Sequence, residues 1–102
     1  MKIHYGTVYL PHINYTVRFR RAKKAPAAID GAYGWAVSDD KYGCTVFLSP
    51  KDTVSGVAHE LVHVLRYICE ERHMDFRTES EHMAYIMQHL MGFVLDFRWK
   101  KK

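Results

Sequence analysis

The chain has 102 residues, of which 48% are hydrophobic and 14% aromatic, so we expect one globular domain over residues 1–102 and exclude a disordered chain. Its formal net charge of +4 is mildly basic, which permits a nucleic-acid partner without requiring one. No apolar run is long enough to span a bilayer, and the N-terminus alternates too regularly to be the apolar region of a secretory signal. We therefore expect a cytoplasmic protein with no membrane partner.

The cysteines and the basic residues point to no further function. Cys44 and Cys69 are too few for a disulfide framework and do not form a CxxC pair, so we expect free thiols and disfavour a thiolate zinc site. The basic residues gather at 18–24 and 98–102, which is typical of a solvated linker and a solvated chain end. No base-stacking motif accompanies them, so the sequence disfavours a nucleic-acid partner.

The first third of the chain predicts a β-hairpin. Apolar and polar residues alternate over Lys2–Leu10, with an irregularity near Gly6, and alternate more regularly over Ile13–Phe19. Pro11 interrupts the pattern between the two runs, as a turn would. The basic, alanine-rich segment that follows contains a proline, which limits any helix there to a short turn at Pro26–Ile29.

A second hairpin is predicted in the middle of the chain. Its arms are Tyr33–Val37 and Cys44–Leu48, and both contain good strand-forming residues. The polar residues of Ser38–Lys41 predict the turn between the arms.

Two helices are predicted in the remaining sequence. The first is capped by Asp52 or Thr53 and runs to Arg72, and the second covers Glu79–Phe97. The short link His73–Arg77 makes them antiparallel neighbours. The predicted fold is therefore α+β, with a small, mostly antiparallel sheet of two hairpins packed on two antiparallel helices.

The first helix carries the motif His59-Glu60-Leu61-Val62-His63. Residues four apart project from the same face of a helix, so the two imidazoles can bind one metal ion. Glu60 lies about 100° around the helix axis from His59, which places it beside the metal rather than on it. This pattern is typical of zinc peptidases, in which the glutamate is the general base.

A catalytic zinc usually has three protein ligands, so a third is needed besides His59 and His63. We favour Glu81, near the start of the second helix, as the third ligand. An alternative stays open, because Thr78–Glu81 also fits a capping box in which Glu81 only reaches back to the helix start. Glu79, His82 and Asp75 are other candidate ligands at similar sequence distances.

Two further residues are candidates for catalysis. Tyr85 follows Glu81 by one helical turn and shares its face, so its hydroxyl could line or support the site. His73, in the link between the helices, could stabilise an oxyanion, although a solvated loop histidine is the more ordinary role.

The sequence here resembles the zincin superfamily, specifically its gluzincin-like branch. The resemblance rests on Val57–Leu65, which contains the HExxH motif, and on Glu81–Met87, which is similar to the second segment of minimal HExxH proteins of phages and prophages. It is also similar to ImmA-type peptidase domains. The resemblance implies a zincin-like fold, a glutamate as third ligand and, for a phage protein, the host cytoplasm.

The resemblance also implies a way of binding substrate. An edge strand of the sheet would hold an extended peptide or protein by β-augmentation, and Tyr33–Val37 is the candidate strand. Larger relatives place an aspartate four residues past the third ligand, where this chain has Tyr85. We therefore expect a zinc metallopeptidase in which Glu60 activates a zinc-bound water. The alternative is a weakly active or inactive zinc-binding module that binds or inhibits a partner protein.

Overall fold

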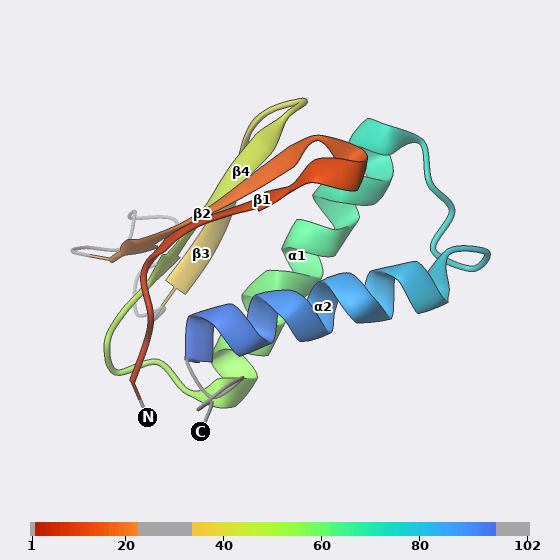
Figure 1. Ribbon diagram of the computed structural model, residues 1–102. Helices are drawn as coiled ribbons and strands as arrows, with labels where there is room; N and C mark the ends of the chain where they lie inside the picture. Colours follow the sequence, from red (N-terminus) through yellow and green to blue (C-terminus); the bar gives the residue numbers. More distant parts are fainter. Residues whose placement is uncertain (1, 23–33, 96–102) are drawn as a thin grey trace, which may run out of the picture.

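A computed structural model of the protein describes residues 2–22 and 34–95, and Figure 1 shows the arrangement of its elements. In chain order these are β1 (Gly6–Leu10), the 3-10 helix η1 (Pro11–Ile13), β2 (Tyr15–Arg21), β3 (Gly34–Asp40), β4 (Gly43–Leu48), α1 (Val54–Arg72) and α2 (Ser80–Leu95). This order confirms the α+β class. The predicted turn at Pro26–Ile29 lies outside the described residues.

The four strands form one mixed sheet in the order β1-β2-β4-β3. The β1–β2 and β3–β4 pairs are antiparallel, which confirms both predicted hairpins. The hairpins join through a parallel pairing of β2 with β4, which runs from Thr16 opposite Gly43 to Arg21 opposite Leu48. In this order β3 is an edge strand of the described sheet, on the side away from β1.

The turn predicted over Ser38–Lys41 is wrong in its extent, because β3 continues to Asp40. The Thr45 hydroxyl donates a hydrogen bond of 2.7 Å to the Asp39 carboxylate, which ties this part of β3 to β4. The backbone N–H of Tyr42 donates to the Asp40 carboxylate at 2.8 Å and closes a tighter turn. Side-chain bonds therefore extend the strand into a segment whose polar composition favours a turn.

The first strand is shorter than predicted, because it begins at Gly6 rather than Lys2. Gly6, the first residue of β1, has a φ of 152°, a backbone conformation that favours glycine. Upstream of it, the backbone N–H of His4 donates to the carbonyl of Val94 at 2.7 Å. The residues before Gly6 thus contact the end of α2 instead of extending the β1–β2 ladder.

Both predicted helices are present; the second begins at Ser80, one residue after the predicted start, and its predicted end at Phe97 lies outside the described residues. Thr53 caps α1, because its hydroxyl accepts the N–H of Gly56 at 3.0 Å, and α1 ends at Arg72 as predicted. α2 is described as far as Leu95 and runs back across α1 at an oblique angle (Figure 1). No helix among the described residues is long and apolar enough to cross a membrane.

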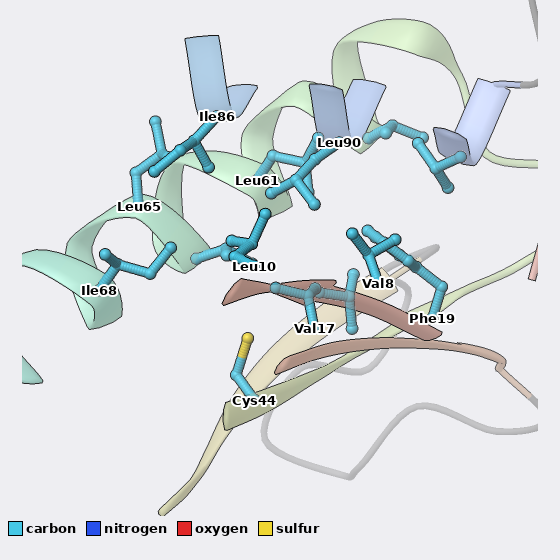
Figure 2. Close-up of a cluster of buried hydrophobic side chains, with 14 of the residues drawn as sticks. Val8, Leu10, Val17, Phe19, Cys44, Leu61, Leu65, Ile68, Ile86 and Leu90 are labelled. Carbon is cyan, nitrogen blue, oxygen red and sulfur yellow. The ribbon is translucent and has the colours of Figure 1, made fainter. Parts of the chain in front are cut away.

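The hydrophobic core lies between one face of the sheet and the two helices (Figure 2). Side chains from α1, α2 and the first two strands converge there: Leu61, Leu65, Ile68, Ile86, Leu90, Val8, Leu10, Val17 and Phe19. Each is at most 7% exposed, so this packing determines which face of α1 is turned inward. The histidine pair of α1 lies outside this set.

Candidate metal centre

His59 and His63 lie side by side on α1. Their ring centroids are 5.1 Å apart and the ring planes meet at 74°, in an edge-to-face arrangement. Leu61 and Val64 are fully buried on the core side of the helix, which keeps the two imidazoles on another face. His59 is exposed and His63 is half-buried, so the pair is accessible from solvent.

The histidine pair opens into a cavity of about 380 Å³ between α1 and the edge strand β3. The cavity is lined by Gly34, Trp35, Ala36, His59, Glu60, His63, Arg66 and Tyr67. One wall is therefore the motif face of α1 and the other is the start of β3. The structure brings three predicted site residues, the two histidines and Glu60, together in one pocket.

Glu60 is a buried carboxylate in this pocket. Burial raises its pKa above the ordinary value for a glutamate, because a charged carboxylate is poorly solvated there. Positive charge on His59 and His63 acts in the opposite direction, and the nearby Asp52 carboxylate raises the pKa further. A raised pKa suits a residue that must accept a proton near neutral pH and release it again.

Asp52, predicted only as a helix cap, is a second buried carboxylate, close enough to Glu60 to influence its charge. Its Oδ1 accepts the N–H of Thr53 at 2.8 Å. Its Oδ2 lies 3.0 Å from where a side-chain Cβ on Gly34 would stand, and the Phe47 carbonyl oxygen lies 2.7 Å from that same position. Gly34 therefore lets β3 pack closely against both β4 and the start of α1.

Tyr67 and Arg66 also line the pocket, although they were not predicted as site residues. Helical spacing could have indicated both residues, because they follow His63 by about one turn and so share its side of α1. Tyr67 also joins the two walls of the pocket, since its hydroxyl donates to the carbonyl of Ala36 at 3.1 Å. This bond fixes the separation of α1 from the edge strand.

Replacing Tyr67 with phenylalanine is expected to lower the free energy of unfolding by about 1 kcal/mol, because the half-buried Ala36 carbonyl loses its donor. Urea denaturation of the two proteins measures the difference. Tyr85→Phe is the matched control, since that tyrosine is 60% exposed, and its effect should stay within about 0.5 kcal/mol. Equal effects of the two substitutions would show that the Tyr67 bond does not hold the walls together.

Glu81 is not brought to the histidine pair. The start of α2 packs beside the far half of α1, where the Cys69 thiol lies 3.6 Å from the Met83 sulfur. Cys69 follows His59 by ten residues, or about 15 Å along the helix axis. Among the described residues, no three His, Cys, Asp or Glu side chains form a group that could hold a metal ion. Glu81 as the third ligand stays a prediction.

The alternative ligands make other contacts. His82 Nδ1 lies 3.7 Å from a carboxylate oxygen of Glu79, and Asp75 accepts hydrogen bonds from the backbone and side chain of Arg77. Those bonds hold the pKa of Asp75 below its ordinary value. None of these residues lines the α1–β3 pocket.

The two further catalytic candidates also lie elsewhere. Tyr85 lines a different cavity, together with residues of η1 and α2. His73 ends α1 in the left-handed conformation, with a φ of 54°, and its backbone N–H donates to the carbonyl of Cys69. His73 therefore has a visible structural role as a helix cap, and the catalytic roles of both residues stay predictions.

The donor set fits zinc in part. Two adjacent imidazoles are ligands that zinc prefers, and a carboxylate beside them in a cavity matches the position of a general base. Comparison with family models, curated proteins and solved structures finds no match for this chain. The resemblance to zincins therefore stays a prediction from the sequence motif.

Proposed function

We propose that the protein is a zinc-dependent peptidase whose active site is the α1–β3 pocket. The observation that carries the proposal is that His59, Glu60 and His63 share one pocket whose opposite wall is an edge strand. His59 and His63 hold the ion, and the sequence predicts Glu81 as the third ligand, which the described arrangement does not supply. The packing of the motif helix on a small mixed sheet supports a zincin-like fold.

Zinc, when bound, supplies a Lewis acid that polarises a carbonyl group and makes water more acidic. Glu60 accepts a proton from the water as its oxygen attacks the carbonyl carbon of the peptide bond. The same carboxyl group then delivers that proton to the nitrogen, which leaves as an amine when the carbon–nitrogen bond breaks. The raised pKa of Glu60 supports both transfers, since it brings the proton affinity of the carboxylate closer to neutral pH.

The edge strand β3 supports a peptide substrate bound in an extended conformation. Among the described strands β3 pairs with β4 alone, and an edge of this kind can accept the backbone of another chain. The predicted docking strand was Tyr33–Val37, of which Gly34–Val37 belongs to β3 and Tyr33 lies outside the described residues. Gly34, Trp35 and Ala36 line the pocket, so a peptide on this edge would pass beside Glu60.

Removal of zinc tests the proposal. The full chain is freed of metal with a chelator and incubated with an unfolded protein substrate, before and after zinc is restored. We expect cleavage to disappear with the metal and to return with zinc, and we expect no return in His63→Ala. The proposal would be contradicted if cleavage survived chelation. It would also be contradicted if no cleavage occurred at any zinc concentration.

A second function uses the same edge strand without catalysis. A partner protein could add a strand to β3 and stay bound, with zinc serving only to stabilise the domain. This binding module would show stoichiometric complex formation that is unchanged in Glu60→Gln. A peptidase would release cleaved product, and Glu60→Gln would retain the intact substrate.

A further inference from the structure

A second pair of histidines meets between η1 and the start of α2, outside the α1–β3 pocket. The Nε2 atoms of His12 and His82 are 2.8 Å apart, and their ring centroids are 4.9 Å apart. His12 belongs to η1, between the first two strands, and His82 lies in the first turn of α2. Both imidazoles therefore direct the same nitrogen to one point, from segments that are seventy residues apart in the sequence.

The surroundings fix the backbone beside His12 and give the His82 ring a second neighbour. Arg72 fixes η1, because its guanidinium donates to the carbonyls of Ile13 and Asn14 at 2.8 Å each. On the other side, His82 turns its Nδ1 toward the Glu79 carboxylate, 3.7 Å away. At this distance there is no direct hydrogen bond, but a carboxylate on the Nδ1 side favours the proton on Nδ1 and leaves Nε2 to bind a metal.

We propose that His12 and His82 form a second transition-metal site, for an ion of the zinc, nickel or copper class. Neutral imidazole nitrogens suit these ions, and two of them from separate elements form a bidentate clamp. The site is independent of the proposed peptidase function, since neither histidine lines the α1–β3 pocket.

The observed distance is compatible with this role. Zinc–nitrogen bonds of about 2.0–2.1 Å in a tetrahedral site place two nitrogens roughly 3.3 Å apart, so the rings need to separate by only about 0.5 Å. Without metal the two nitrogens share one hydrogen bond, which requires one ring to donate and the other to accept. When a metal ion binds, the shared proton moves to Nδ1 of the ring that donated it, so both Nε2 lone pairs are available to the ion.

The cavity beside the pair leaves room for the remaining ligands. It has a volume of about 230 Å³ and is open to solvent, and its lining includes Tyr9, Tyr85 and His89. Since the described residues bring no three metal-binding side chains together, water completes the coordination. His89 lies two helical turns from His82, about 10 Å along the axis, and is not a ligand.

Zinc titration of the full chain tests the proposal. The double variant His59→Ala/His63→Ala removes the first predicted site, and we expect it still to bind one equivalent of zinc by calorimetry. Binding is expected to weaken at least tenfold when His12→Ala or His82→Ala is added. Because the ion joins η1 to α2, a tenfold excess over Kd is expected to raise Tm by roughly 5–10 °C.

His89→Ala is the matched control, since it removes a histidine from the same cavity without touching the pair. Added to the double variant His59→Ala/His63→Ala, it should leave the affinity for zinc unchanged. No zinc binding in the double variant, or binding that resists His82→Ala, would overturn the proposal.

A measurement on the wild-type chain covers the case in which the double variant does not fold. Long-range ¹H–¹⁵N spectra should then show zinc moving the Nε2 signals of His12 and His82. Unchanged Nε2 signals at saturating zinc would also overturn the proposal.

Discussion

Replacing Glu60 with glutamine is expected to lower peptide cleavage by about 10²–10⁴-fold and to leave the zinc stoichiometry unchanged. Glutamine has nearly the same size, so the buried side chain still fills its place in the pocket. Its amide cannot accept a proton from water, so the general base is lost. Steady-state cleavage and metal analysis of the same preparations measure the two effects separately.

Glu70→Gln is the control for this experiment. Glu70 is on the same helix, but its side chain is 60% exposed and does not line the pocket. Its contact with Arg66, at 3.8 Å, is a surface ion pair that contributes little to stability. Cleavage should stay near the wild-type rate. If Glu60→Gln also kept that rate, Glu60 would have no part in proton transfer.

Leu61→Ala is expected to lower the free energy of unfolding by about 2–5 kcal/mol. Leu61 lies inside the HExxH motif but on the core side of α1, fully buried and facing Leu90 of α2 in Figure 2. The substitution leaves a cavity between the helices and the sheet. A loss of this size is a large share of the stability of a small domain, so thermal melting should show it clearly.

Val62→Ala tests whether that effect comes from packing rather than from the motif. Val62 is the next residue, but it is 57% exposed on the outer side of α1. Its replacement should change the free energy of unfolding by no more than about 0.5 kcal/mol. Similar losses for the two variants would mean that the inward face of α1 is assigned wrongly.

Local sequence patterns predicted most of the fold. Alternating apolar residues predicted the first hairpin, and strand-forming residues on either side of a polar turn predicted the second. A cap at Asp52 or Thr53 predicted the start of α1. The parallel pairing of β2 with β4 was not predicted, because alternation indicates which face of a strand is buried but not which strand lies next to it. The extent of β3 was missed because it depends on side-chain bonds to Asp39 and Asp40.

Of the candidate site, the sequence predicted the residues that share one helix but not the contacts between separate elements. The spacing of His59, Glu60 and His63 on one helix was enough to place them together. Helical spacing could also have indicated Tyr67, but its bond to Ala36 depends on how β3 meets α1. The position of Glu81 depends on where α2 packs along α1, and no local pattern determines that.

Both walls of the α1–β3 pocket come from one uninterrupted stretch of chain. β3, β4 and α1 follow one another directly in the chain, yet the bond that joins the pocket walls spans 31 residues, from Ala36 to Tyr67. The β2–β4 ladder closes a loop of similar length, since Thr16 pairs with Gly43. Closing the pocket and closing the sheet therefore cost similar entropy, so chain connectivity does not favour either one to form first in folding.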